Sequence, residues 1–183
     1  MFYIMRHGQT EWNRIHKLQG QTDIPLNDNG REMARNAKEE YKDVHFDVCY
    51  CSPLVRAKET ADLVLEGRDI PIIYDDRLME MNFGEYEGAE NTFADENHPI
   101  NVVFKKPEEY TESVGGSETF EELFSRTGEF LRDIVYPLLE EGKDVLVVAH
   151  GAMNLSIVSQ IKDLPRERFW EPSIANCELM RLI

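Results

Sequence analysis

The sequence predicts an α/β fold, a three-layer α/β/α sandwich around a mostly parallel sheet. Short apolar runs typical of buried strands alternate with longer amphipathic segments typical of helices, which is the pattern of parallel sheets covered by helices. The strand-like runs are FYIM, FDVCYC, IPIIY and VLVVA. At 183 residues, of which 42% are hydrophobic, the chain is long enough for one core and too short for two. We therefore expect a single domain over residues 1–183.

The first and last of these runs end in the same way. FYIM leads into Arg6 and His7 and is bounded by Gly8, and VLVVA is followed by His150 and a glycine. The carboxyl ends of parallel strands share one edge of the sheet, where open α/β sheets place ligands. We therefore expect His7 and His150 to face one crevice, with Arg6 beside the first.

Two helices are expected from their amphipathic patterns. After Leu26, the segment NDNGREMARNAKEEYK predicts a helix with Asn27 as its N-cap. Further on, FEELFSRTGEFLRDIVYPLLEE predicts a long final helix with Gly128 and Pro137 as weak points.

A third helix places a second arginine near the crevice. The run SPLVRAKETADLVLEG predicts a helix that Ser52 caps and Pro53 begins, with Arg56 in its first turn. Helix N-termini attract anions through free N–H groups and the macrodipole. Together with Arg6 and the two histidines, Arg56 would make a pocket suited to a phosphoryl group, which carries roughly −1.5 to −2 charges. The predicted ligand is a phosphate ester.

Residues 84–116 break the alternation of strands and helices. They contain no long periodic run and include Pro99 and Pro107. A connection this long inside a compact domain is usually a lid, a binding loop or a disordered segment, and we expect a lid. Five aromatic residues in or beside it could either line an apolar wall or anchor the lid to the core: Phe83, Tyr86, Phe93, Phe104 and Tyr110.

Composition narrows the partners and the compartment. A net charge of −15 argues against nucleic acid as a partner. No apolar stretch approaches the length of a membrane span, and Arg6 interrupts the N-terminal run before it could serve as a signal-peptide core. Cys49, Cys51 and Cys177 suit neither a zinc knuckle nor a disulfide framework. We expect a cytoplasmic protein with reduced thiols and no membrane partner; the sequence predicts no oligomeric state.

Six motifs, in their order and spacing, are similar to those of the histidine phosphatase superfamily, in its phosphoglycerate-mutase-like branch (branch 1). They are RHGQTEWN, LQGQTDIPLNDNG, CSPLVRAKETA, DRLMEMNFGEYEG, GGSETFEEL and VVAHGAMN. The RHG tripeptide alone has little specificity, whereas six ordered motifs that span nearly the whole chain are a strong resemblance. The resemblance implies a phosphoglycerate-mutase-like fold and a metal-independent phosphatase of small-molecule phosphate monoesters.

The resemblance also implies roles for individual residues. His7 would be the nucleophile that forms a phosphohistidine, and Glu80 would protonate the leaving alcohol and then serve as the base for water. Arg6, Arg56 and His150 would surround the transferred phosphoryl group. Positions that line the family's phosphate pocket are matched by Asn13, Gln19, Gly20 and Gly151. These residue types suit the chemistry, because two arginines disfavour protonation of a nucleophilic imidazole while they clamp the substrate.

Metal and cofactor chemistry have no motif in the sequence. There is neither an HExxH cluster nor a GxxxxGK[ST] loop, so we expect no metal ion and no cofactor. The cysteines upstream of Arg56 lack the spacing of a cysteine phosphatase. His16, His45 and His98 are expected to be surface or structural residues.

Two alternative functions stay open. The first is a cofactor-dependent phosphoglycerate mutase of the same branch. Mutases of this branch resemble one another in having an arginine directly after the catalytic glutamate, where this chain has Met81. From Glu85 to Glu122, eleven carboxylates stand against two lysines and no arginine, so this segment would repel a second anionic group within a Debye length of about 8 Å. The second is a non-catalytic protein that binds a phosphorylated ligand. The substrate is open among sugar phosphates, phosphoserine, nucleoside monophosphates and α-ribazole phosphate.

Overall fold

The computed structural model describes residues 1–90, 92 and 94–183. In this part of the chain the sheet has five strands in the order β3-β2-β4-β1-β5. The strands are β1 (Phe2–Arg6), β2 (Val48–Cys51), β3 (Ile72–Tyr74), β4 (Val145–Ala149) and β5 (Leu179–Arg181). Neighbouring strands are parallel except for β5, which is antiparallel to β1. The mostly parallel sheet is therefore confirmed.

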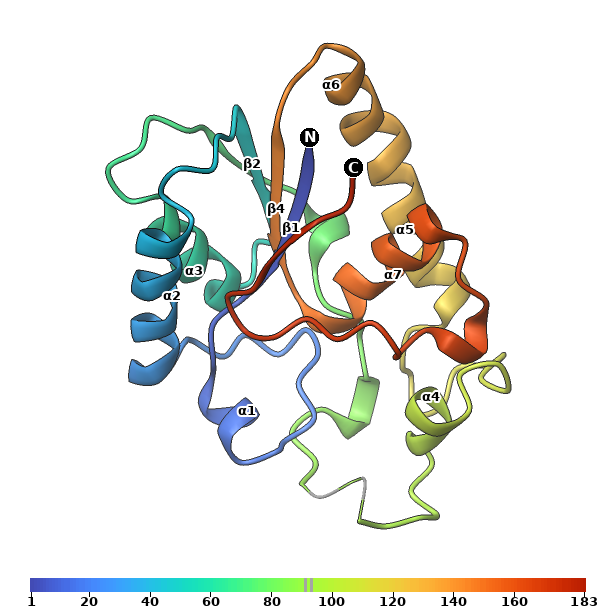
Figure 1. The fold of residues 1–183 in the computed structure, drawn as a ribbon. Coiled ribbons are helices and arrows are strands. Elements are labelled where there is room, and N and C mark those ends of the chain that lie inside the picture. Colours follow the sequence, from blue (N-terminus) through green and yellow to red (C-terminus); the bar gives the residue numbers. More distant parts are fainter. Residues whose placement is uncertain (91, 93) are drawn as a thin grey trace.

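Helices cover both faces of the sheet, as predicted for a three-layer sandwich (Figure 1). Side chains of a strand alternate between its two faces, and along β1 Phe2 and Ile4 enter one core cluster while Tyr3 and Met5 enter the other. The second cluster packs against α2 (Asp28–Glu40) and α3 (Val55–Leu65). On the other face lie α5 (Phe120–Phe130), α6 (Tyr136–Glu140) and α7 (Gly151–Lys162).

The long helix predicted to be the final one is a continuous helical run with one wide turn, but it is not the last helix, since α7 follows β4. Between α5 and α6, residues Leu131–Val135 form a π-helix, in which the Tyr136 N–H donates to the Leu131 carbonyl. Pro137 follows at once and has no N–H to continue the regular pattern, which accounts for the irregularity here. Gly128, the other predicted weak point, lies within regular α5.

The helices α2 and α3, which cover the same face of the sheet, begin differently. Asn27 caps α2 as predicted, because its side chain accepts the Gly30 N–H at 2.8 Å. The predicted start of α3 at Ser52 and Pro53 is wrong: the helix begins at Val55 after an extended Leu54. The Val55 N–H donates to Asp23 Oδ1 at 2.7 Å, so the cap comes from a distant loop.

The 84–116 segment lies beyond the carboxyl edge of the sheet, near α1 (Glu11–Arg14) (Figure 1). It contains α4 (Asn101–Lys105), and it is anchored to the core by Ile100, Val103 and Tyr110, which are buried. Tyr110 thus serves as an anchor, whereas Phe93 lies outside the described residues. Movement of the 84–116 segment as a lid stays a prediction.

Single 3-10 turns are found at Asp76–Leu78, Gly84–Tyr86 and Arg166–Arg168. None of the helices in the described ranges is long and apolar enough to cross a membrane.

Candidate active site

His7 and His150 lie side by side at the carboxyl ends of the adjacent strands β1 and β4. Their ring centroids are 5.1 Å apart and the rings are inclined by 58°. The His7 N–H continues the ladder by donating to the Ala149 carbonyl at 2.9 Å. The side chains are 2% and 0% exposed, respectively. The two histidines therefore lie together at one edge of the sheet, as predicted, but neither is among the residues that line the cavity described below.

The His7 ring is held in one tautomer. Nδ1 is 2.6 Å from the Gly8 carbonyl oxygen, which can only accept, so Nδ1 carries the hydrogen and Nε2 keeps a lone pair. Burial, together with the charges of Arg56 and Arg6, holds the pKa of His7 well below its usual 6.5. Near neutral pH, His7 is therefore an uncharged imidazole with an available Nε2.

Arg56 is fully buried, so it is not a solvent-exposed arginine on the surface of its helix. Its guanidinium donates to the Thr22 carbonyl at 3.0 Å and to the Gly20 carbonyl at 2.5 Å. Burial lowers the pKa of Arg56 to about 10, so the group stays charged at neutral pH. Thr60 links it to the end of β1, because the Thr60 hydroxyl donates to the Arg56 carbonyl at 2.7 Å and accepts the Gly8 N–H at 3.0 Å.

Three buried nitrogen atoms of this group lack a hydrogen-bond partner within the described part of the chain. They are Nε of Arg6, Nε of Arg56 and Nδ1 of His150. Arg6 is otherwise held through one terminal nitrogen, which donates to the Ile174 carbonyl at 3.2 Å. Buried polar atoms are rarely left unpaired in folded proteins. A ligand that brings several oxygen acceptors, such as a tetrahedral oxyanion, is the kind of partner that such unpaired nitrogen atoms suit.

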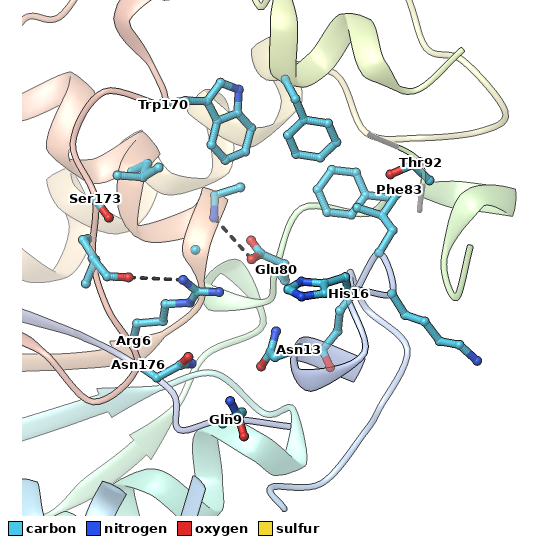
Figure 2. A pocket seen from close by; sticks show the side chains of 18 of the residues that line it. Arg6, Gln9, Asn13, His16, Glu80, Phe83, Thr92, Trp170, Ser173 and Asn176 are labelled. Carbon is cyan, nitrogen blue, oxygen red and sulfur yellow. Dashed lines mark hydrogen bonds between the residues drawn. The ribbon is translucent and has the colours of Figure 1, made fainter. Parts of the chain in front are cut away.

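Glu80 lies at the N-terminus of α7 and is 7% exposed. Its Oε1 accepts the N–H groups of Met81 at 2.8 Å and Met153 at 3.0 Å, and its Oε2 accepts the Ala152 N–H at 3.2 Å. Figure 2 shows Glu80 and Arg6 pointing into the same space. Gly151 brings the helix close to both, since a Cβ added there would lie 3.5 Å from Glu80 Oε2.

The space in front of these groups is a cavity of about 770 Å³ (Figure 2). Asn13, Gln19 and Gly151, three of the predicted binding residues, line it. Asn13 Oδ1 accepts the Thr10 N–H at 3.0 Å, and Gln19 Oε1 accepts the Thr10 hydroxyl at 2.6 Å. Gly20 contributes through its carbonyl, which holds Arg56. Of the predicted site residues, those that line the cavity are Arg6, Asn13, Gln19, Glu80 and Gly151, whereas His7, Gly20, Arg56 and His150 are not among its lining residues.

The family follows from the whole-chain comparison. A family model described as the histidine phosphatase superfamily (branch 1) matches residues 2–183. The chain belongs to this superfamily. Membership makes it an enzyme of the histidine phosphatase type, as the motifs predicted, and its fold is phosphoglycerate-mutase-like.

Relatives of this histidine phosphatase carry different activities in their names. An uncharacterized phosphatase, PhoE, of Bacillus subtilis is 34% identical over 181 residues, which cover 96% of this chain and 86% of the relative. A 2,3-bisphosphoglycerate-dependent phosphoglycerate mutase of Cytophaga hutchinsonii is 31% identical, covering 90% of this chain and 78% of the relative. Among solved structures, Bacillus stearothermophilus YhfR matches with a TM-score of 0.85 and 32% identity, over 96% of this chain and 86% of that one.

Sequence reasoning missed part of the cavity of this histidine phosphatase. His16, expected at the surface or in a structural role, lines the cavity with a left-handed backbone (φ 57°). Trp170, Ile174 and Asn176 also line it, from an irregular segment after α7. Asn176 donates to the His7 carbonyl at 2.6 Å. A segment without periodicity gives no signal of such contacts, and only the folded chain brings it to β1.

An apolar wall closes one side of the cavity. Phe104 packs between Phe83, at a centroid distance of 5.6 Å, and Trp170, at 5.0 Å. All three residues line the cavity. Phe83 and Phe104 belong to the aromatic set for which the sequence left both a wall and an anchoring role open, whereas Trp170 was not predicted.

One group of the described residues has side chains close enough to share a metal ion. It consists of His45, Asp47 and Asp144, and the two aspartates directly precede β2 and β4, at the sheet edge opposite His7. Both carboxylates already have cationic partners: Asp144 pairs with the N-terminal ammonium at 2.5 Å and Asp47 with Lys143 at 3.6 Å. This group therefore has no part in the site described above.

Proposed function

We propose that this histidine phosphatase hydrolyses a small-molecule phosphate monoester, without a metal ion, through a phosphohistidine on His7. The observation that carries the proposal is the uncharged His7 ring, whose Nε2 keeps a lone pair, beside the charges of the buried Arg56 and the half-buried Arg6, with the Glu80 carboxylate near Arg6. A covalent intermediate splits one difficult displacement into two easier ones.

In the first step, His7 Nε2 attacks phosphorus and the bond to the leaving alcohol breaks. Glu80 gives its proton to that alcohol oxygen, and Oε2 is the suitable atom because its one described contact is the Ala152 N–H. Arg6, Arg56 and His150 donate to the phosphoryl oxygens through the nitrogens described above. Stabilising this charge is most of what phosphoryl transfer requires of a protein.

In the second step, water attacks the phosphohistidine. Glu80 takes a proton from the water, the bond between phosphorus and Nε2 breaks, and its electron pair returns to His7. Inorganic phosphate leaves, and Glu80 is protonated again for the next cycle. Asn13, Gln19, Gly20 and Gly151 complete the proposed phosphate pocket by shaping its wall and by holding Arg56.

The charges around the cavity favour transfer to water over a mutase reaction. Met81 stands at the position where mutases have an arginine. Its side chain is uncharged and buried, so this position offers no cation to the cavity. Beyond Arg6, the described lining residues include one lysine, Lys17, which pairs with Glu90 at 3.2 Å. We propose a monoester whose alcohol part is neutral, cationic or apolar and packs on the wall of Phe83, Phe104 and Trp170.

We further propose that residues 1–183 act as one domain and that the protein works in the cytoplasm. All three cysteines are free and buried, and burial raises the pKa of each thiol. Such thiols are unreactive and fit a reducing compartment.

Phosphate release tests the proposal. The purified protein is assayed in excess EDTA with p-nitrophenyl phosphate and a panel of monophosphates, and mutase activity is measured with 3-phosphoglycerate and catalytic 2,3-bisphosphoglycerate. We expect phosphate release that survives EDTA and is lost in His7→Ala. His45→Ala, which changes an exposed histidine, is the matched control and should keep wild-type activity.

Two results would contradict the proposal. Mutase turnover with little phosphate release would show transfer to a bound acid and support the phosphoglycerate mutase. Binding of phosphate esters without turnover in either assay would support a non-catalytic protein.

A further inference from the structure

We infer that Arg126 is a positioning residue for Glu80: it holds the backbone that carries the proton donor, without touching the substrate. The inference rests on the proposed function, since it concerns the proton that Glu80 gives to the leaving group. Arg126 lies in α5, an element that contributes none of the residues assigned a role above.

All five N–H groups of the Arg126 guanidinium have an acceptor. Nε and one terminal nitrogen bind the two carboxylate oxygens of Glu118, at 2.6 and 3.0 Å. The other terminal nitrogen donates to the carbonyls of Arg77 and Met79, at 2.6 and 2.7 Å, and the last donor reaches the Glu80 carbonyl at 3.2 Å. A guanidinium has five donors in a fixed planar fork, so this set fixes the peptide chain before Glu80 in one place.

Glu118 extends the clamp to the residues after Glu80. Its carboxylate accepts the Asn82 N–H at 3.0 Å, and its own N–H donates to the Asn82 carbonyl at 2.7 Å. Gln21 donates to the Glu80 carbonyl at 3.1 Å. The side chains of Arg126 and Glu118 are only 18% and 11% exposed, so solvent screens this ion pair less than a surface pair.

Glu80 therefore sits between two helices that are joined to each other. Its carboxylate is held by the first N–H groups of α7 and its main chain by Arg126 of α5. The helices are linked by Thr127, whose hydroxyl is contacted by Ser156 at 3.0 Å and Gln160 at 2.8 Å. A displacement of about 1 Å can cost on the order of 10²-fold in rate, so a loosened main chain at Glu80 should impair proton transfer.

Two aryl esters of similar shape test the inference. Phenolate is a much poorer leaving group than p-nitrophenolate, so phenyl phosphate depends more on a proton from Glu80 than p-nitrophenyl phosphate does. For Arg126→Lys we expect kcat/KM to fall on the order of 10–100-fold with phenyl phosphate and far less with p-nitrophenyl phosphate. Arg132→Lys, an exposed arginine in the same helical run, is the matched control and should lower neither value.

The outcomes separate this inference from the proposed function. Equal losses with both esters, or no loss, in a folded Arg126→Lys protein would overturn the positioning role. Absence of phosphate release by the wild-type protein would instead overturn the proposed function. If Arg126→Lys does not fold, Glu118→Gln removes the charge of the ion-pair partner and must show the same selective loss with phenyl phosphate; an unselective result there also overturns the inference.

Discussion

His150 and Ser52, which directly follow the adjacent strands β4 and β2, are joined by a contact of 2.7 Å between His150 Nε2 and the Ser52 hydroxyl. The contact leaves His150 Nδ1 as the nitrogen without a partner among the described residues. When the hydroxyl donates to Nε2, Nδ1 carries the hydrogen and can donate to a phosphoryl oxygen. Ser52, predicted as a helix cap, thus orients the second histidine instead.

Ser52→Ala should lower activity without changing the pocket residues themselves. Loss of one hydrogen bond to a buried group costs about 1–3 kcal/mol, so we expect kcat/KM to fall roughly 5- to 160-fold. Steady-state kinetics with p-nitrophenyl phosphate measures the effect. Ser125→Ala, an exposed serine of α5, is the control. Wild-type kinetics in Ser52→Ala would show that His150 keeps its orientation without the hydroxyl.

The free energy of unfolding should decrease as the pH is lowered below about 6.5, because both buried histidines resist protonation. Burial holds the pKa of His7 and of His150 well below 6.5, and the positive charge of Arg56 adds to this. Below pH 6.5 the unfolded chain binds protons that the native protein does not, so the free energy of unfolding decreases as the pH falls. Each histidine contributes a slope of at most about 1.36 kcal/mol per pH unit, and this contribution fades within about one pH unit above 6.5.

Urea denaturation at pH 7.5, 6.5 and 5.5 measures this slope. His150→Gln should reduce the slope below pH 6.5, whereas His45→Gln, at an exposed position, should leave it unchanged. A slope in His150→Gln equal to that of the wild-type protein would mean that His150 is not the group responsible. The acid limb of kcat/KM should also lie below pH 6.5, since His7 needs its free Nε2 for attack.

The sequence predicted the strands β1 to β4, the helix α2, the region of α3, the helical run from α5 to α6 and the meeting of His7 with His150, because these depend on local periodicity and on the geometry of parallel sheets. It did not predict β5, α1, α4 or α7. It was wrong at the start of α3, where Asp23 from a distant loop supplies the cap. It could not predict that Arg126 holds the chain before Glu80, since side-chain contacts between distant segments have no local pattern. The place of Trp170 at the cavity could not be predicted either, because its indole N–H donates to the Val103 carbonyl at 2.7 Å, which is a contact between distant segments.

Gly30→Ala should destabilise the fold, because α2 passes close to the loop after β1. A Cβ at Gly30 would clash with the Gln9 backbone, and one at Gly8 would lie 2.6 Å from the Gly30 carbonyl oxygen. Overpacking costs about 1–3 kcal/mol, and a clash with backbone belongs to the upper part of this range, so we expect a net loss of about 1–2 kcal/mol after the gain of roughly 1 kcal/mol from replacing glycine by alanine in a helix. Thermal and urea denaturation should show a net loss of stability.

Gly128→Ala is the matched control on the other face of the sheet. A Cβ there would meet the end of the flexible Gln160 side chain, at 2.7 Å, and not backbone. We expect stability to be unchanged or slightly increased. If both variants lost the same stability, the close approach of α2 to the loop after β1 would not be what limits Gly30.

Trp170→Leu should lower kcat/KM for an aryl ester more than for a small alkyl ester, because it removes one end of the aromatic wall. Contacts between aromatic rings contribute about 0.5–1.5 kcal/mol beyond burial of their area, so kcat/KM for phenyl phosphate should fall by roughly 2–12-fold. Methyl phosphate has no ring to pack on the wall, so its kcat/KM should not change. Tyr74→Leu, at an exposed position on the edge strand β3, controls for loss of an aromatic residue elsewhere. Equal losses for both esters would mean that Trp170 supports the fold of the cavity through its bond to Val103 and does not select the alcohol part of the substrate.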